Sequence, residues 1–116
     1  MLYVVGKYSL LEGTFLKSSE LEDLKILRDK VAKITLEIIR LSSERLALAR
    51  KIGEIKARNN MPVEDPDVEN ELKLKVVDFS RKHGIDEGFS LKILELLLEE
   101  SKKVQREALE PKKHGE

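Results

Sequence analysis

Residues 19–59 decide the fold of this chain: SELEDLKILRDKVAKITLEIIRLSSERLALARKIGEIKARN. The stretch contains no proline and a single glycine, Gly53. Its apolar residues recur at alternating spacings of three and four along almost its whole length, and they are Leu24, Leu27, Val31, Ile34, Ile38, Leu41, Leu48, Ile52 and Ile55. A heptad repeat sustained in this way is typical of a helix that packs along another helix.

Both ends of the predicted helix carry termination signals. Ser19 is followed three residues later by Glu22, a capping-box pattern in which each side chain covers a free backbone N–H group. At the other end, Asn59 and Asn60 can adopt the left-handed conformation that closes a helix, and Pro62 prevents its continuation. We therefore expect one uninterrupted helix.

A helix of this length cannot bury its apolar face within its own chain. About forty residues, each rising 1.5 Å, make a rod of roughly 60 Å. A compact domain of 116 residues has a radius of gyration of only about 13 Å. We therefore expect an all-α chain that forms an obligate, helix-entwined homodimer.

Composition narrows the classes of function. The 22 basic and 22 acidic residues give a net charge of zero, so we expect neither nucleic acid nor a membrane as a partner. The absence of cysteine excludes disulfides, thiolate catalysis and cysteine-ligated metals, and it is typical of a cytoplasmic protein.

The rest of the chain predicts an N-terminal extension and two shorter helices. Residues 1–17 contain short apolar runs around Gly6, which fit either a β-hairpin or a flexible segment, and we assign them no function. Asp65 and Pro66 read as the N-cap and first residue of a second helix that ends near Gly84. Asp86 can cap a third helix running to about residue 109. The helical domain is thus expected over residues 18–110, with a frayed tail over 111–116.

One position of the long helix breaks the apolar repeat, because Arg45 stands between Leu41 and Leu48. A cation there is costly unless an anion meets it, either a glutamate such as Glu44 or a bound ligand. Lys56 projects within about 20° of Arg45, about 16 Å further along the axis. Arg28 points roughly 100° away from Arg45, so in an antiparallel dimer it would reach the partner's pocket instead.

Two polar pairs lie at i,i+4 spacing and so share a helical face: Asp65 with Glu69, and Ser101 with Gln105. Each pair fits a solvated surface equally well, and Asp65 fits a simple N-cap. Neither pair identifies a site by itself.

The order and spacing of these residues resemble the all-α chorismate mutases over about residues 20–110. The matching positions are Leu27-Arg28-Asp29-Lys30-Val31, Glu44-Arg45, Leu48-Ala49, Lys56, Pro62-Val63-Glu64-Asp65, Glu69, Glu99-Glu100-Ser101 and Gln105. The resemblance implies an intertwined homodimer that converts chorismate to prephenate, a step of aromatic amino acid biosynthesis. One departure is Val68, which stands where many members of the family carry arginine.

The resemblance also implies roles for single residues. Arg45 and Lys56 would hold the carboxylates of the substrate from one chain, and Arg28 would do so from the other. Lys56 and Gln105 would donate hydrogen bonds to the ether oxygen of the substrate. Glu69 would accept a hydrogen bond from the ring hydroxyl, with Asp65 and Ser101 in supporting contacts. The rearrangement is unimolecular, so it requires no nucleophile, metal or cofactor.

Alternative functions stay open at the level of sequence. A lyase of the same fold that acts on isochorismate would use a nearly identical site. A non-catalytic helical interaction module would use Arg45 only to set the register of the helices. A DNA-binding regulator is disfavoured by the net charge and by the lack of a helix-turn-helix pattern.

Overall fold

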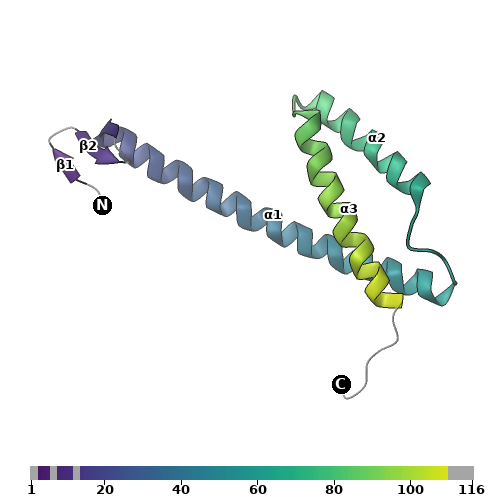
Figure 1. The fold of residues 1–116 in the computed structure, drawn as a ribbon. Helices are drawn as coiled ribbons and strands as arrows, with labels where there is room; N and C mark the ends of the chain where they lie inside the picture. Colours follow the sequence, from purple (N-terminus) through teal and green to yellow (C-terminus); the bar gives the residue numbers. More distant parts are fainter. Residues whose placement is uncertain (1–2, 6–7, 12–13, 110–116) are drawn as a thin grey trace, which may run out of the picture. The chain divides into compact units, whose positions relative to one another are not determined.

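The computed structural model describes residues 3–5, 8–11 and 14–109. Within these ranges three short strands precede three helices (Figure 1). The elements are β1 (Tyr3–Val5), β2 (Tyr8–Leu11), β3 (Thr14–Lys17), α1 (Ser18–Arg58), α2 (Pro66–Lys82) and α3 (Glu87–Leu109). The prediction of an all-α fold with one very long first helix is confirmed. The predicted frayed tail lies outside the described residues.

The chain divides into two compact units, Met1–Arg40 and Leu41–Glu116, and α1 contributes to both. In the first unit the strands form an antiparallel sheet in the order β1-β2-β3, with Val4 opposite Ser9 and Leu10 opposite Phe15. β3 ends at Lys17 and α1 begins at the next residue. Ser19, the predicted N-cap, is instead the second residue of α1.

The apolar seam in the N-terminal part of α1 is exposed in the single chain. Leu27, Val31 and Ile34 keep 57%, 63% and 62% of their surface accessible. Such a row of exposed aliphatic side chains along a helix is typical of a surface that another helix covers.

The ends of the helices agree closely with the sequence signals. After α1, Asn60 adopts the predicted left-handed conformation, with φ of 54°. Gly84, after α2, has φ of 64°, which confirms it as the residue that ends this helix. At the start of α3, the carboxylate of Asp86 accepts a hydrogen bond from the Phe89 amide at 2.8 Å, as expected of an N-cap.

Asp65 behaves differently from an ordinary cap. It stands at the N-cap position of α2 with Pro66 at the first helical position, but its side chain makes no capping hydrogen bond. Pro66 has no N–H group, so the first turn of α2 has one unpaired backbone donor fewer. The Asp65 carboxylate instead lines a pocket, which is described below.

In the second unit the chain reverses direction between α2 and α3, and these two helices pack against each other (Figure 1). Apolar residues buried in the described part of this unit are Ala49, Val63 and Leu94. Its buried polar side chains are Lys56, Ser80, Ser101 and Gln105. The described interior of this unit is therefore small and unusually polar. None of the described helices is long and apolar enough to cross a bilayer.

α1 and α3 approach each other closely at Gly53. A Cβ atom at this position would lie 2.7 Å from the Cα atom of Gln105 and 3.1 Å from the Cβ atom of Ala108. Only a residue without a side chain fits there, so the single glycine of the long helix sets how near Gln105 stands to α1.

Candidate active site

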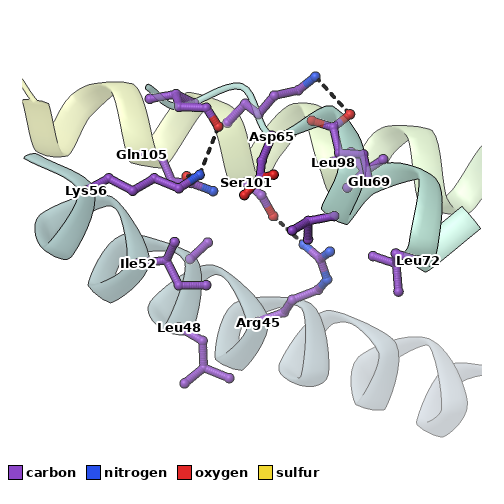
Figure 2. A pocket seen from close by; sticks show the side chains of 14 residues that line it. Arg45, Leu48, Ile52, Lys56, Asp65, Glu69, Leu72, Leu98, Ser101 and Gln105 are labelled. Carbon is purple, nitrogen blue, oxygen red and sulfur yellow. Dashed lines mark hydrogen bonds and ion pairs between the residues drawn. The ribbon is translucent and has the colours of Figure 1, made fainter. Parts of the chain in front are cut away.

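A pocket of about 470 Å³ lies between the C-terminal part of α1, the segment after it, α2 and α3, all within the second unit (Figure 2). Its walls combine aliphatic side chains with a few charged and amide groups. They are formed by Arg45, Leu48, Ala49, Ile52, Lys56, Val63, Asp65, Val68, Glu69, Leu72, Leu98, Ser101, Lys102 and Gln105. This mixture is typical of a site for a small polar ligand.

Arg45 reaches from α1 toward α3. Its Nη1 atom donates to the backbone carbonyl of Leu97 at 3.2 Å and to the hydroxyl of Ser101. Ser101 is buried and Arg45 is half-buried. A guanidinium has five N–H donors, so these two contacts orient the group and leave further donors for an anion in the pocket.

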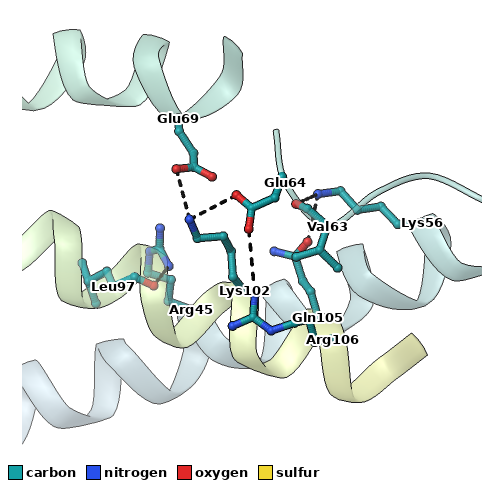
Figure 3. Close-up of polar contacts among 9 residues, drawn as sticks. All are labelled: Arg45, Lys56, Val63, Glu64, Glu69, Leu97, Lys102, Gln105 and Arg106. Carbon is teal, nitrogen blue, oxygen red and sulfur yellow. Dashed lines mark hydrogen bonds and ion pairs between the residues drawn. The ribbon is translucent and has the colours of Figure 1, made fainter. Parts of the chain in front are cut away.

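Lys56 lies deeper, with 8% of its surface exposed. Its ammonium donates to the Val63 carbonyl and to Oε1 of Gln105, both at 2.9 Å (Figure 3). An ammonium has three protons, so one donor direction is left for a ligand.

The contact with Lys56 also fixes the orientation of the Gln105 amide. Because an ammonium only donates, the oxygen of Gln105 must face Lys56, and its NH₂ group must face elsewhere. A buried lysine and a buried amide therefore present N–H donors side by side.

The part of the pocket that the start of α2 forms carries two carboxylates. Asp65 and Glu69 are half-buried near the start of α2. Glu69 Oε1 lies 3.5 Å from Nζ of Lys102 on α3, and the same nitrogen lies 3.3 Å from Oε2 of Glu64 (Figure 3). Burial lowers the pKa of Lys102, but the hydrogen bond that Lys102 donates to Glu64 and the nearby negative charges of Glu69 and Glu64 outweigh this effect, so the pKa is raised above its ordinary value.

Six residues singled out in the sequence line this one pocket although they come from three helices and a loop. They are Arg45, Lys56, Asp65, Glu69, Ser101 and Gln105. The seventh, Arg28, is an exposed residue of the first unit and does not line the pocket of its own chain.

Sequence reasoning missed two features of the pocket. The Val63 carbonyl, which holds Lys56, leaves no trace in a sequence. Lys102 stands four residues after Leu98 and three before Gln105, so helical spacing puts it on the pocket face of α3. It was overlooked because Lys103 and Arg106 lie beside it, and nothing in the local sequence separates the three.

Comparison of the sequence with known proteins assigns the chain to a family. The sequence profile of chorismate mutase type II matches residues 27–106, which include every residue proposed for the site. The chain belongs to the chorismate mutase type II family. This confirms the resemblance and the all-α class that it implied.

Individual relatives agree with the family match. The chorismate mutase of Methanocaldococcus jannaschii is 32% identical over 90 residues, which is 78% of this chain and 91% of that protein. Bifunctional chorismate mutase/prephenate dehydratases also match: that of Aquifex aeolicus is 40% identical over 62 residues, 53% of this chain and 17% of that protein. For Escherichia coli the identity is 28% over 87 residues, covering 75% of this chain and 22% of the bifunctional protein.

Val68, the departure from the usual pattern of the family, lines the pocket and is 55% exposed. It contributes no charge. The cations that line the pocket are Arg45, Lys56 and Lys102, and the carboxylates are Asp65 and Glu69.

Proposed function

We propose that this chain is a chorismate mutase, which converts chorismate to prephenate in the pocket formed by α1, α2 and α3. The observation that carries this proposal is the meeting of Arg45, Lys56 and Gln105 in one pocket of a chain that belongs to the family. The activity named for the relatives supports the same assignment.

The chemistry suits these residue types. The rearrangement breaks one C–O bond and forms one C–C bond within a single molecule, and no proton or electron leaves the substrate. A protein accelerates such a step by holding the reactive chair-like conformer and by placing fixed donors where negative charge develops. Neither task requires a side chain that titrates near neutral pH.

Arg45 is proposed to bind a carboxylate of chorismate. Its contacts with Ser101 and the Leu97 carbonyl hold the guanidinium in place before the substrate enters, so little ordering remains to be done on binding. Ser101 is assigned a supporting contact in the same region.

Lys56 and Gln105 are proposed to donate hydrogen bonds to the ether oxygen, which gains negative charge as the C–O bond stretches. The amide NH₂ group is free for this because the amide oxygen is turned toward Lys56. Both side chains are buried, and donors that are fixed and shielded from water stabilise a developing charge more than mobile water does.

Glu69 is proposed to accept a hydrogen bond from the ring hydroxyl of the substrate, with Asp65 in a supporting contact. Both carboxylates come from the start of α2 and the residue before it, whereas Arg45 stands on α1.

The site is proposed to be completed by a second copy of the chain, which contributes Arg28. Chorismate carries two carboxylates, and a further arginine would match the second one. The exposed heptad seam that includes Leu27, Val31 and Ile34 supports a homodimer, because a helix with such a face is stabilised by a partner helix.

The proposal is tested by incubating the purified protein with chorismate and following both loss of chorismate and formation of prephenate. We expect prephenate as the sole product, with unchanged rates after treatment with EDTA. Isochorismate is assayed in parallel. Formation of pyruvate and salicylate from isochorismate, without prephenate from chorismate, would assign the lyase activity instead. Lack of turnover of both substrates by a folded dimer would favour the interaction module.

A further inference from the structure

Lys102 is a cation of the pocket that the proposed mechanism does not use. Arg45 and Lys56 have assigned roles. Lys102 follows Ser101 in the sequence, and its ammonium faces the carboxylate of Glu69. Its side chain is only 23% exposed, so it is not an ordinary solvated lysine of a helix surface.

The contact between Lys102 and Glu69 links two walls of the pocket. Glu69 stands on α2, Lys102 on α3, and their charged atoms are 3.5 Å apart (Figure 3). Both side chains are about three-quarters buried, at 26% and 23% exposure, so water screens this pair less than it screens the other ion pairs of the pocket rim. The raised pKa of Lys102 means that it stays a cation throughout the neutral range.

A glutamate side chain has several freely rotating bonds, and fixing them costs free energy. If the Glu69 carboxylate is already held in one place, accepting a substrate hydroxyl costs less side-chain entropy. The ammonium of Lys102 occupies one oxygen, Oε1, and leaves the lone pairs of the other oxygen for a ligand.

We propose that Lys102 is a positioning residue for the proposed reaction: it fixes the carboxylate of Glu69 so that this group accepts the hydrogen bond of the substrate's ring hydroxyl. The inference rests on the proposed function and deepens it, since a residue of α3, Lys102, would hold the residue of α2, Glu69, that recognises the substrate hydroxyl.

A purely structural role for Lys102 makes a different prediction. Lys102 also contacts Glu64, an exposed residue of the segment that joins α1 to α2. Arg106 contacts the same carboxylate at 3.9 Å and does not line the pocket. Arg106→Met is therefore the matched control, because it removes a cation from Glu64 and leaves the Lys102–Glu69 pair in place.

The first measurement compares kcat/KM for chorismate among three variants. We expect kcat/KM of Lys102→Met to be about tenfold lower than that of the wild type, because a substrate held in the wrong place reacts more slowly even when the altered contact is far from the reacting atoms. Lys102→Arg, which keeps a cation within reach of Glu69, should recover most of the activity. Arg106→Met should match the wild type. Equal losses in Lys102→Met and Arg106→Met would assign the effect to the Glu64 segment and overturn the proposal.

The second measurement uses a chorismate analogue that lacks the ring hydroxyl. The ratio of kcat/KM for chorismate to that for the analogue is taken on one sample, so it does not depend on the folded fraction. This ratio should fall about tenfold in Lys102→Met, as it should in Glu69→Ala, and the double variant should be no worse than Glu69→Ala. An unchanged ratio in Lys102→Met, or additive losses in the double variant, would overturn the inference.

Different results would contradict the proposed function and the role of Lys102. A wild-type protein that does not convert chorismate contradicts the proposed function before any variant is compared. An active wild type whose Lys102→Met variant keeps both its rate and its ratio contradicts only the role of Lys102.

Discussion

Arg45 occupies a position of α1 at which the heptad repeat calls for an apolar side chain, and this made it visible in the sequence. Its hydrogen bonds run to Ser101 and to the Leu97 carbonyl, both on α3. A charged group placed in an apolar surface needs compensation, and that physical requirement is what links the sequence signal to the pocket. Lys102 had no comparable signal, because the charged residues Lys103 and Arg106 stand beside it in the sequence.

Arg45→Ala should cost on the order of 3 kcal/mol of transition-state stabilisation, or about 10²-fold in kcat/KM, because a fixed cation at the substrate is lost. Alanine is a good helix former, so the helix should persist. Arg50→Ala is the matched control: Arg50 stands on the same helix and pairs with Glu107 at 3.3 Å, but does not line the pocket. Comparable activity in the two variants would mean that Arg45 does not bind the substrate.

Gln105→Glu should make the reaction depend on pH. At neutral pH the new carboxylate offers only acceptors to the ether oxygen, whereas its protonated form has an O–H donor. The adjacent ammonium of Lys56 favours the ionised form, so recovery should require acidic solution. We expect kcat/KM of this variant to rise as the pH falls, over a range in which circular dichroism shows the fold intact. A profile parallel to that of the wild type would mean that residue 105 does not face the substrate.

At the scale of the elements, the sequence predicts the helices closely because their ends are coded locally. The first helix was expected over residues 19–59 and is found at Ser18–Arg58, and Asp86 caps α3 as predicted. The paths of the first 17 residues could not be predicted, since short apolar runs around glycines fit a hairpin and a flexible segment equally well. The hydrogen bond from Lys56 to the Val63 carbonyl could not be predicted either, because every residue has a backbone carbonyl and the sequence does not mark which one is used.

Gly53→Ala tests the close approach of α1 and α3. The added methyl group would lie 2.7 Å from a backbone atom of Gln105, which cannot move aside as a flexible side chain would. Overpacking of this kind costs about 1–3 kcal/mol, against a gain of about 1 kcal/mol in helix propensity. We expect a lower free energy of unfolding in urea and a lower kcat/KM, because Gln105 is displaced.

The control for this substitution is Ser43→Ala, at an exposed position of the same helix. Its free energy of unfolding should stay within about 0.5 kcal/mol of the wild type. If Gly53→Ala proves more stable than the wild type and equally active, the close approach of the two helices is not what positions Gln105.

For the whole molecule, we propose that two chains share each active site. The apolar seam of α1 is exposed in the single chain, and the pocket lacks Arg28 of its own chain. In the sequence, the dimer is predicted from the apolar repeat of the helix together with its length, because a compact chain of this size cannot cover a rod of roughly 60 Å. Which residues of the partner enter the site depends on the pairing of two chains, and it therefore stays a proposal.

Complementation between two inactive variants is a direct test of a site shared by two chains. Arg28→Ala and Arg45→Ala are unfolded together in equal amounts, refolded, and assayed for prephenate formation. Random re-association gives about half heterodimers, and in each of these one site has both arginines while the other has neither, as two-fold symmetry requires. Activity should then recover to roughly a quarter of the wild-type value. Activity that stays at the sum of the separate variants, although heterodimers are shown to form, would contradict a site shared between two chains.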